Sequence, residues 1–114
     1  MGAALENRLP KQDFSPMLNA IDQGPDAIVA HVRDQMEAVI HLTGISQVLA
    51  ACTLRAEVSL LSRRMLADAY RETPSLEKCK ANKQLREAVT NLLVGNDELP
   101  KSVQATLEDA AFQL

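Results

Sequence analysis

Four side chains between residues 28 and 42 are of the types that bind metals or transfer protons, namely His31, Asp34, Glu37 and His41. On an α-helix, which turns about 100° per residue, they fall within an arc of roughly 120° and can converge on one face. Histidine and carboxylate together bind zinc or iron. One helix alone cannot close such a site, and the chain has no second histidine motif. We therefore expect a solvated polar face with local charge pairs, and neither a metal nor another cofactor.

Two cysteines are the other residues that could carry chemistry. Cys52 lies in an apolar run typical of a small buried side chain, and Cys79 has two neighbouring lysines but no sequence-evident base or oxyanion hole. Their spacing is not that of a CxxC motif, so we expect both to stay reduced. The four glycines are isolated and form no phosphate-binding loop. The sequence thus predicts a protein that is not an enzyme.

The composition indicates the class of fold. Hydrophobic residues make up 46% of the 114 and charged residues 24%, which is typical of a folded domain rather than a disordered chain. Aromatic residues are only 3%, so aliphatic side chains must fill the interior, and this favours packed helices. Charges interrupt every long apolar run, and the first 20 residues lack the apolar core of a signal peptide. We therefore expect a cytoplasmic protein that does not bind membranes.

The periodicity of the apolar residues predicts an all-α fold. Residues 1–14 show no sustained period and are expected to form a flexible N-terminal arm, and residues 15–114 a single helical domain. A long helix is predicted over about 46–72, and the short connection RETPSLE should make the next helix fold back antiparallel. Gly44 either kinks one helix or separates two. The predicted architecture is a small bundle of four to five helices with one long central helix and an antiparallel helical hairpin.

The long helix carries apolar residues on more than one side. One seam, within residues 51–65, advances in alternating steps of three and four residues, as in a coiled coil. The other helices offer about one apolar face each, so part of this surface should stay uncovered. We expect the surplus to bind a second copy, with a dimer as the first expectation, or another protein, as in an adaptor, a chaperone-like protein or an accessory subunit. The predicted interface residues are Leu54, Val58, Leu61, Met65, Leu107 and Leu114.

A helix-turn-helix regulator that binds DNA is the first alternative. Gly44 stands between two helical patterns in the manner of such a motif, and Arg55, Arg63 and Arg64 follow on the second helix. However, that helix begins with mostly apolar residues, and the net charge of the chain is −3 at pH 7, whereas phosphate contacts need a pronounced basic patch. We therefore rank nucleic acid below protein as the expected partner.

The second alternative comes from a resemblance. The segment TLRAEVSLLSRRMLADAY, residues 53–70, resembles the C-terminal helical segment of type III secretion inner-rod and needle subunits. Those subunits are small helical export substrates that polymerise, so the resemblance implies a polymerising part of a secretion apparatus. It covers 18 of the 114 residues, consists of common helix-forming residues, and is followed by 44 residues that those families lack. We keep it as an alternative and assign no family.

Overall fold

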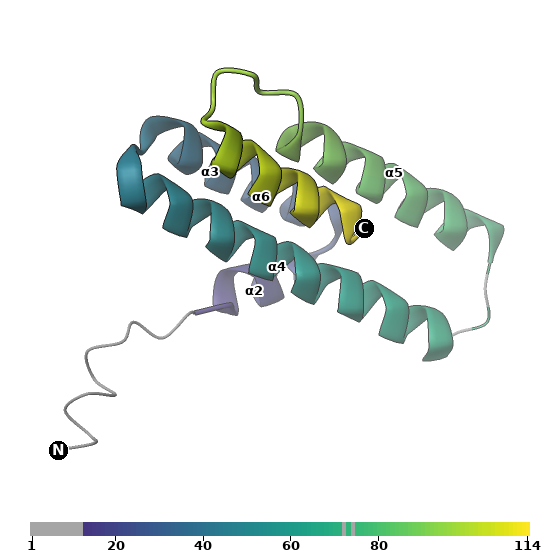
Figure 1. Cartoon of the computed structure of the whole chain (residues 1–114). Helices are drawn as coiled ribbons and strands as arrows, with labels where there is room; N and C mark the ends of the chain where they lie inside the picture. Colours follow the sequence, from purple (N-terminus) through teal and green to yellow (C-terminus); the bar gives the residue numbers. More distant parts are fainter. Residues whose placement is uncertain (1–12, 72, 74) are drawn as a thin grey trace, which may run out of the picture.

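The computed structural model describes residues 13–71, 73 and 75–114, and all regular secondary structure in these ranges is α-helical. Most of the predicted N-terminal arm, residues 1–12, lies outside the described residues. The predicted all-α bundle with one long helix is confirmed (Figure 1). The helices are α2 (Ser15–Gln23), α3 (Pro25–His41), α4 (Gly44–Arg71), α5 (Leu76–Leu93) and α6 (Lys101–Phe112).

Helix boundaries follow local sequence chemistry. Pro16 and Pro25 occupy the first turns of α2 and α3, where a missing backbone N–H costs nothing. The side chain of Ser75 accepts a hydrogen bond of 3.1 Å from the backbone N–H of Lys78 and so caps α5. Gly44 has a φ of +62°, in the left-handed region that favours glycine, and it begins α4 directly after the two residues that separate this helix from α3. Of the two alternatives predicted for Gly44, the chain therefore forms two separate helices and not one kinked helix.

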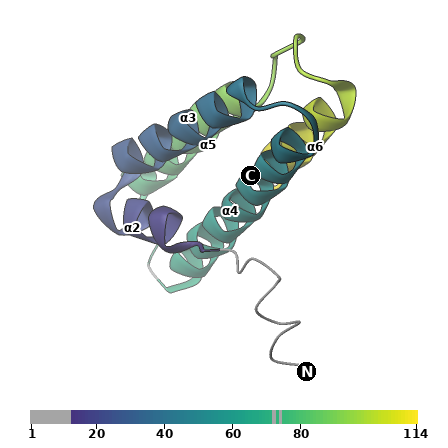
Figure 2. The ribbon, with the colours of Figure 1, turned by 90° about the vertical axis from the view of Figure 1, so that its left-hand side faces the viewer.

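The helices form two pairs that face each other across the core, α3 with α5 and α4 with α6 (Figure 2). The Gln47 side chain donates a 3.0 Å hydrogen bond to the carbonyl oxygen of Val39, which sets the start of α4 beside the end of α3. His31 and Glu57, which lie farther from the turn, are also within hydrogen-bond distance, so the two helices are antiparallel. The start of α6 lies beside the start of α4, and the Ser62 hydroxyl donates a 2.7 Å hydrogen bond to the carbonyl oxygen of Gln113 after the end of α6, so α4 and α6 run in the same direction (Figure 1).

Helices α4 and α5 lie diagonally across the bundle from each other. As predicted, α5 runs back antiparallel to α4 (Figure 1). Its main packing partners, however, are α3 and α6, and α4 itself packs chiefly against α6 and α3. The two helices of the predicted hairpin thus occupy opposite corners of the bundle, with the core between them.

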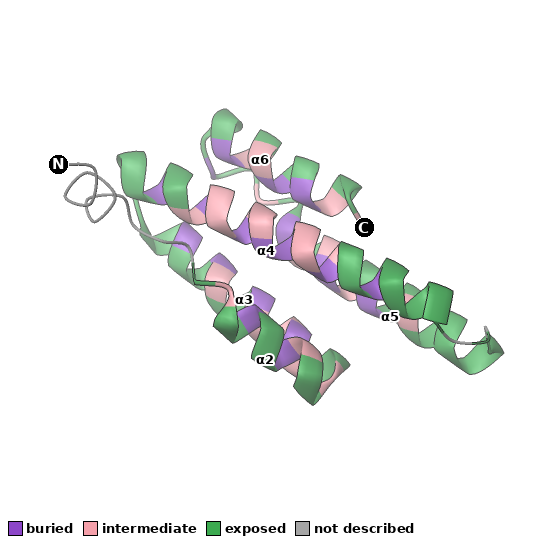
Figure 3. Cartoon of the chain, turned by 90° about the horizontal axis from the view of Figure 1, so that it is seen from below, coloured by how far each residue is buried: buried purple, intermediate pink, exposed green. Residues whose placement is uncertain are grey.

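One continuous apolar core holds the bundle together. All five described helices contribute to it, from Met17 of α2 to Ala110 of α6. The core does not reach the far ends of α4 and α5: residues 66–71 and 76–81 are all exposed (Figure 3). These turns extend beyond the packed part of the molecule and carry Leu66, Tyr70 and Leu76 in solvent.

Among the described residues, α4 is the one helix long and apolar enough to cross a membrane by length and composition. About 33% of the 18-residue window that meets this criterion is buried inside the bundle. The core helix of a soluble protein meets the same criterion, because it too must be apolar on the side that packs. The expected cytoplasmic location and the expected absence of membrane binding stay predictions.

Candidate association surface

The interface residues predicted from the sequence lie in the core of the chain itself. Leu54, Val58, Leu61 and Leu107 are each at most 1% exposed, and Met65 is 9% exposed. Leu114 is partly buried and packs against the same core. The seam on α4 is thus covered by neighbouring helices of the chain, because it is the most continuous apolar stripe that this helix can bury. Uncovered apolar surface on α4 must therefore lie elsewhere on the helix.

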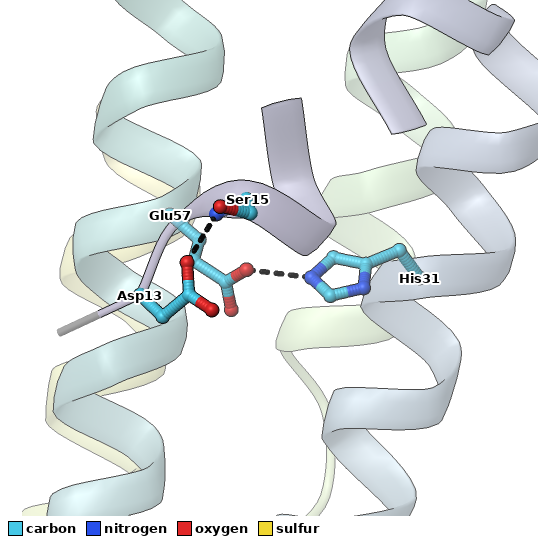
Figure 4. A network of polar contacts seen from close by, with 4 residues as sticks. All are labelled: Asp13, Ser15, His31 and Glu57. Carbon is cyan, nitrogen blue, oxygen red and sulfur yellow. Dashed lines mark hydrogen bonds and ion pairs between the residues drawn. The ribbon is translucent and has the colours of Figure 1, made fainter. Parts of the chain in front are cut away.

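The polar cluster expected on α3 is divided by the fold. Asp34, Glu37 and His41 are exposed, as expected of a solvated face. His31 instead turns toward α4, where its Nε2 lies 2.6 Å from Oε2 of Glu57 (Figure 4). Glu57 is only 1% exposed, and its other carboxyl oxygen has no hydrogen-bond partner among the described residues.

This pair is the most chemically suggestive contact in the bundle, and it consists of one imidazole and one carboxyl group. No group of three or more potential metal ligands comes together in the part of the chain that the structure describes. Sequence reasoning did not single out Glu57. A signal was present: Glu57 follows Leu54 by three residues and precedes Leu61 by four, so a helix must place it beside the buried stripe.

The basic residues of the DNA-binding alternative are not gathered on a protruding recognition helix. Arg55 is partly buried, while Arg63 and Arg64 are exposed, and Arg64 forms an ion pair of 3.6 Å with Asp68 of the same helix. In addition, α3 and α4 are antiparallel neighbours, whereas the two helices of a helix-turn-helix motif meet at about 90–120°. The geometry around Gly44 is therefore that of a helical hairpin.

The outer face of α4, opposite its buried stripe, is apolar at both ends. Among the described residues, six large apolar side chains are more than half exposed, and four of these lie on this face. Ile45 (78%) and Leu49 (60%) lie at its beginning, and Leu66 (58%) and Tyr70 (85%) at its end. Figure 3 shows α4 between α6 on one side and α2 and α3 on the other, with both of its ends exposed.

The middle of the outer face carries small side chains. Cys52, Ala56 and Ser59 lie between the two apolar ends and are partly buried, and Arg63 follows them in an exposed position. Short side chains leave the helix backbone accessible to close approach, as at many helix-helix contacts. The outer face thus has large apolar side chains at both ends, small side chains in the middle and one charged residue.

An apolar groove adjoins the first turns of this face. It lies between the start of α4 and the start of α6, and its volume is about 410 Å³. Ile45, Val48 and Leu49 line it from α4, and the opposite side is lined by Val103 of α6 and by Pro100, which directly precedes α6. A larger hollow of about 520 Å³ lies between α3 and the connection from α5 to α6, but side chains with charges of both signs line it. The groove at α4 is the one that suits an apolar side chain.

Comparisons of the chain with protein-family models, with curated proteins and with solved structures find no match.

Proposed function

We propose that this protein is a non-enzymatic association module and that the outer face of α4 binds another protein chain. The single observation that carries the proposal is the line of four large, mostly exposed apolar side chains, Ile45, Leu49, Leu66 and Tyr70, on a helix whose opposite stripe fills the core. Full burial of a side chain of this size stabilises a complex by about 1.5–3 kcal/mol. A few such anchors supply most of the energy of a typical protein interface.

The distribution of these residues supports a binding face over scattered surface exposure. Single exposed apolar residues are ordinary on any soluble protein. Here they share one face of one helix, and the end near Ile45 continues into an apolar groove shared with α6. This combination of exposed anchors beside a groove is the arrangement by which helices bind helical partners.

The proposal is tested by placing charge at both ends of the face. We expect the double variant Leu49→Asp/Leu66→Asp to keep its helical content, because neither side chain belongs to the core. The double variant should lose the protein association that the unaltered chain shows. Light scattering measures self-association, and affinity capture measures binding to other proteins. Ile40→Asp is the control, since Ile40 is an exposed apolar residue of α3 that lines the hollow beside the connection from α5 to α6 and not the groove at α4.

Two kinds of result would contradict the proposed binding face on α4. A chain that is monomeric at high concentration, and that captures the same proteins with and without the double substitution, would overturn the proposal. So would binding to lipid vesicles, or to duplex DNA at low salt, that the double substitution abolishes while protein association is absent. DNA binding would also weaken steeply as the salt concentration rises, because counterions are released from the phosphates.

A further inference from the structure

We propose that the chain bound at this face is a second copy of the same protein, with the two α4 helices packed antiparallel across a twofold axis. This inference rests on the proposed function and names its partner. It begins from the spacing of the outer face. Positions 45, 49, 52, 56, 59, 63, 66 and 70 advance in alternating steps of four and three, which is the spacing that keeps one seam of a helix against another helix.

This seam is complementary to itself when it is reversed. In an antiparallel pair centred between Ala56 and Ser59, Ile45 of one copy lies opposite Tyr70 of the other, and Leu49 lies opposite Leu66. Large side chains then meet large ones at both ends. In the middle, Ala56 lies opposite Ser59, so the two helices can approach closely where the side chains are small. A twofold interface requires such self-complementarity, because the same patch serves both partners.

Arg63 favours the antiparallel direction over the parallel one. With parallel helices in register, Arg63 of one copy would lie opposite Arg63 of the other, and two like charges would be brought together at the seam. With antiparallel helices, Arg63 lies opposite Cys52. The two arginines are then separated by 11 positions along the seam, or about 16 Å at the rise of an α-helix.

The shapes of the two ends of α4 also match in the antiparallel arrangement. The turn with Leu66 and Tyr70 extends beyond the core, whereas the turn with Val48 borders the groove beside α6. Leu66 and Val48 are 18 residues apart, which is five full turns, so both lie on the same side of α4. The twofold axis that relates the two copies reverses the direction of α4, but it keeps this side of both α4 helices on the same side of the dimer. The projecting end of each copy therefore reaches the groove of the other.

The available area is sufficient for a dimer of moderate affinity. A helix of 28 residues is about 42 Å long, and with a contact strip about 10 Å wide it offers roughly 400 Å² per copy. Two copies bury about 800 Å² on this strip, and side chains that enter the grooves bring the total toward about 1,200 Å², the lower end of the range for specific interfaces. We therefore expect a reversible dimer with a dissociation constant in about the micromolar range.

Engineered cysteines test the partner and the direction together. The native thiols are first removed as Cys52→Ala and Cys79→Ala, and Leu49→Cys or Leu66→Cys is then introduced. Under mild oxidation, a mixture of the two single-cysteine proteins should form a disulfide-linked dimer, and either protein alone should not. A chain that carries both cysteines should stop at a covalent dimer. Circular dichroism of each variant checks that it is folded, and light scattering before oxidation should show mass rising toward twice the 12.5 kDa of the chain.

Each other outcome contradicts the inference in a recognisable way. Cross-linking of the Leu49→Cys protein with itself would show parallel helices, and ladders longer than a dimer from the doubly substituted chain would show head-to-tail polymers. A monomeric chain whose capture of a different protein is lost in Leu49→Asp/Leu66→Asp would overturn the second copy as partner and leave the proposed function standing. Leu66→Asp alone should weaken the dimer at least tenfold, and Ile40→Asp should leave it unchanged.

Discussion

His31 of α3 and Glu57 of α4 meet inside the bundle, with 2.6 Å between Nε2 of the imidazole and Oε2 of the carboxyl group. The side chain of His31 is 14% exposed and that of Glu57 is 2% exposed. A carboxyl group buried to this extent loses its hydration, and only a partner within hydrogen-bond distance offsets that loss. The contact aligns α3 with α4, because it places His31 opposite Glu57, whereas His41, the other histidine of α3, is exposed at the end of that helix.

Removing the imidazole should destabilise the fold. We expect His31→Ala to lower the free energy of unfolding by about 3 kcal/mol, because Glu57 is then buried without its partner. The double variant His31→Leu/Glu57→Leu should recover most of this loss, since apolar side chains of similar volume can replace a buried polar pair at little cost. Urea denaturation followed by circular dichroism gives both values. If the double variant were less stable than His31→Ala, the pair would not be the source of the effect.

The two apolar stripes of α4 should respond differently to truncation. Leu61→Ala should lower the free energy of unfolding by about 2–5 kcal/mol, because Leu61 is 1% exposed and its removal leaves a cavity. Leu49→Ala should change it by no more than about 0.5 kcal/mol, since Leu49 is 60% exposed. Urea denaturation of both variants is measured at a concentration low enough for the chain to be monomeric. Equal losses of unfolding free energy in the two variants would mean that the buried and exposed faces of α4 are wrongly assigned.

The core and the outer face of α4 show what periodicity can and cannot predict. Spacing alone identified the residues that share a side of the helix, and Leu54 and Leu61 are correctly grouped. It did not show which group turns inward. That choice depends on the other helices: the seam that includes Val58 is unbroken and is buried, whereas the outer line is interrupted by Arg63 and stays exposed at both ends. An interface predicted from the strongest seam therefore fell on the core.

Long-range pairing was the other step that the sequence did not reveal. Proline and serine at helix starts act within a few residues, and Pro25 and Ser75 lie at the starts of α3 and α5. His31 and Glu57 are 26 residues apart, and their contact depends on how α3 and α4 align after the turn at Gly44. From the sequence, His31 belonged to a polar surface. In the bundle it meets Glu57 because the antiparallel pairing places the two positions opposite each other.

The carboxyl group at the start of α2 should titrate at low pH. The hydroxyl and the backbone N–H of Ser15 hydrogen bond to Asp13, the latter at 2.9 Å, and they lower the pKa of Asp13 below its ordinary value. The stabilisation that this contact gives is fully present above the ordinary pKa and is lost as the pH falls through the lowered one. Carbon-detected NMR titration measures the pKa of Asp13 directly. Ser15→Ala should raise that pKa part of the way back, because the backbone N–H still donates; an unchanged pKa would exclude the hydroxyl as the main cause.

The turn between α3 and α4 should depend on the backbone freedom of Gly44. Its φ of +62° lies in the region where a Cβ atom strains the chain, and an added Cβ would meet no other heavy atom within 4 Å. The cost of Gly44→Ala is therefore one of backbone conformation alone, and we expect the free energy of unfolding to fall by about 1 kcal/mol. Gly44→Asn should lose less, because asparagine adopts this conformation more readily than alanine. Urea denaturation of both variants in the Leu49→Asp/Leu66→Asp background separates this effect from any change in association. Equal losses for alanine and asparagine would instead indicate that side-chain bulk at this position is what destabilises the turn.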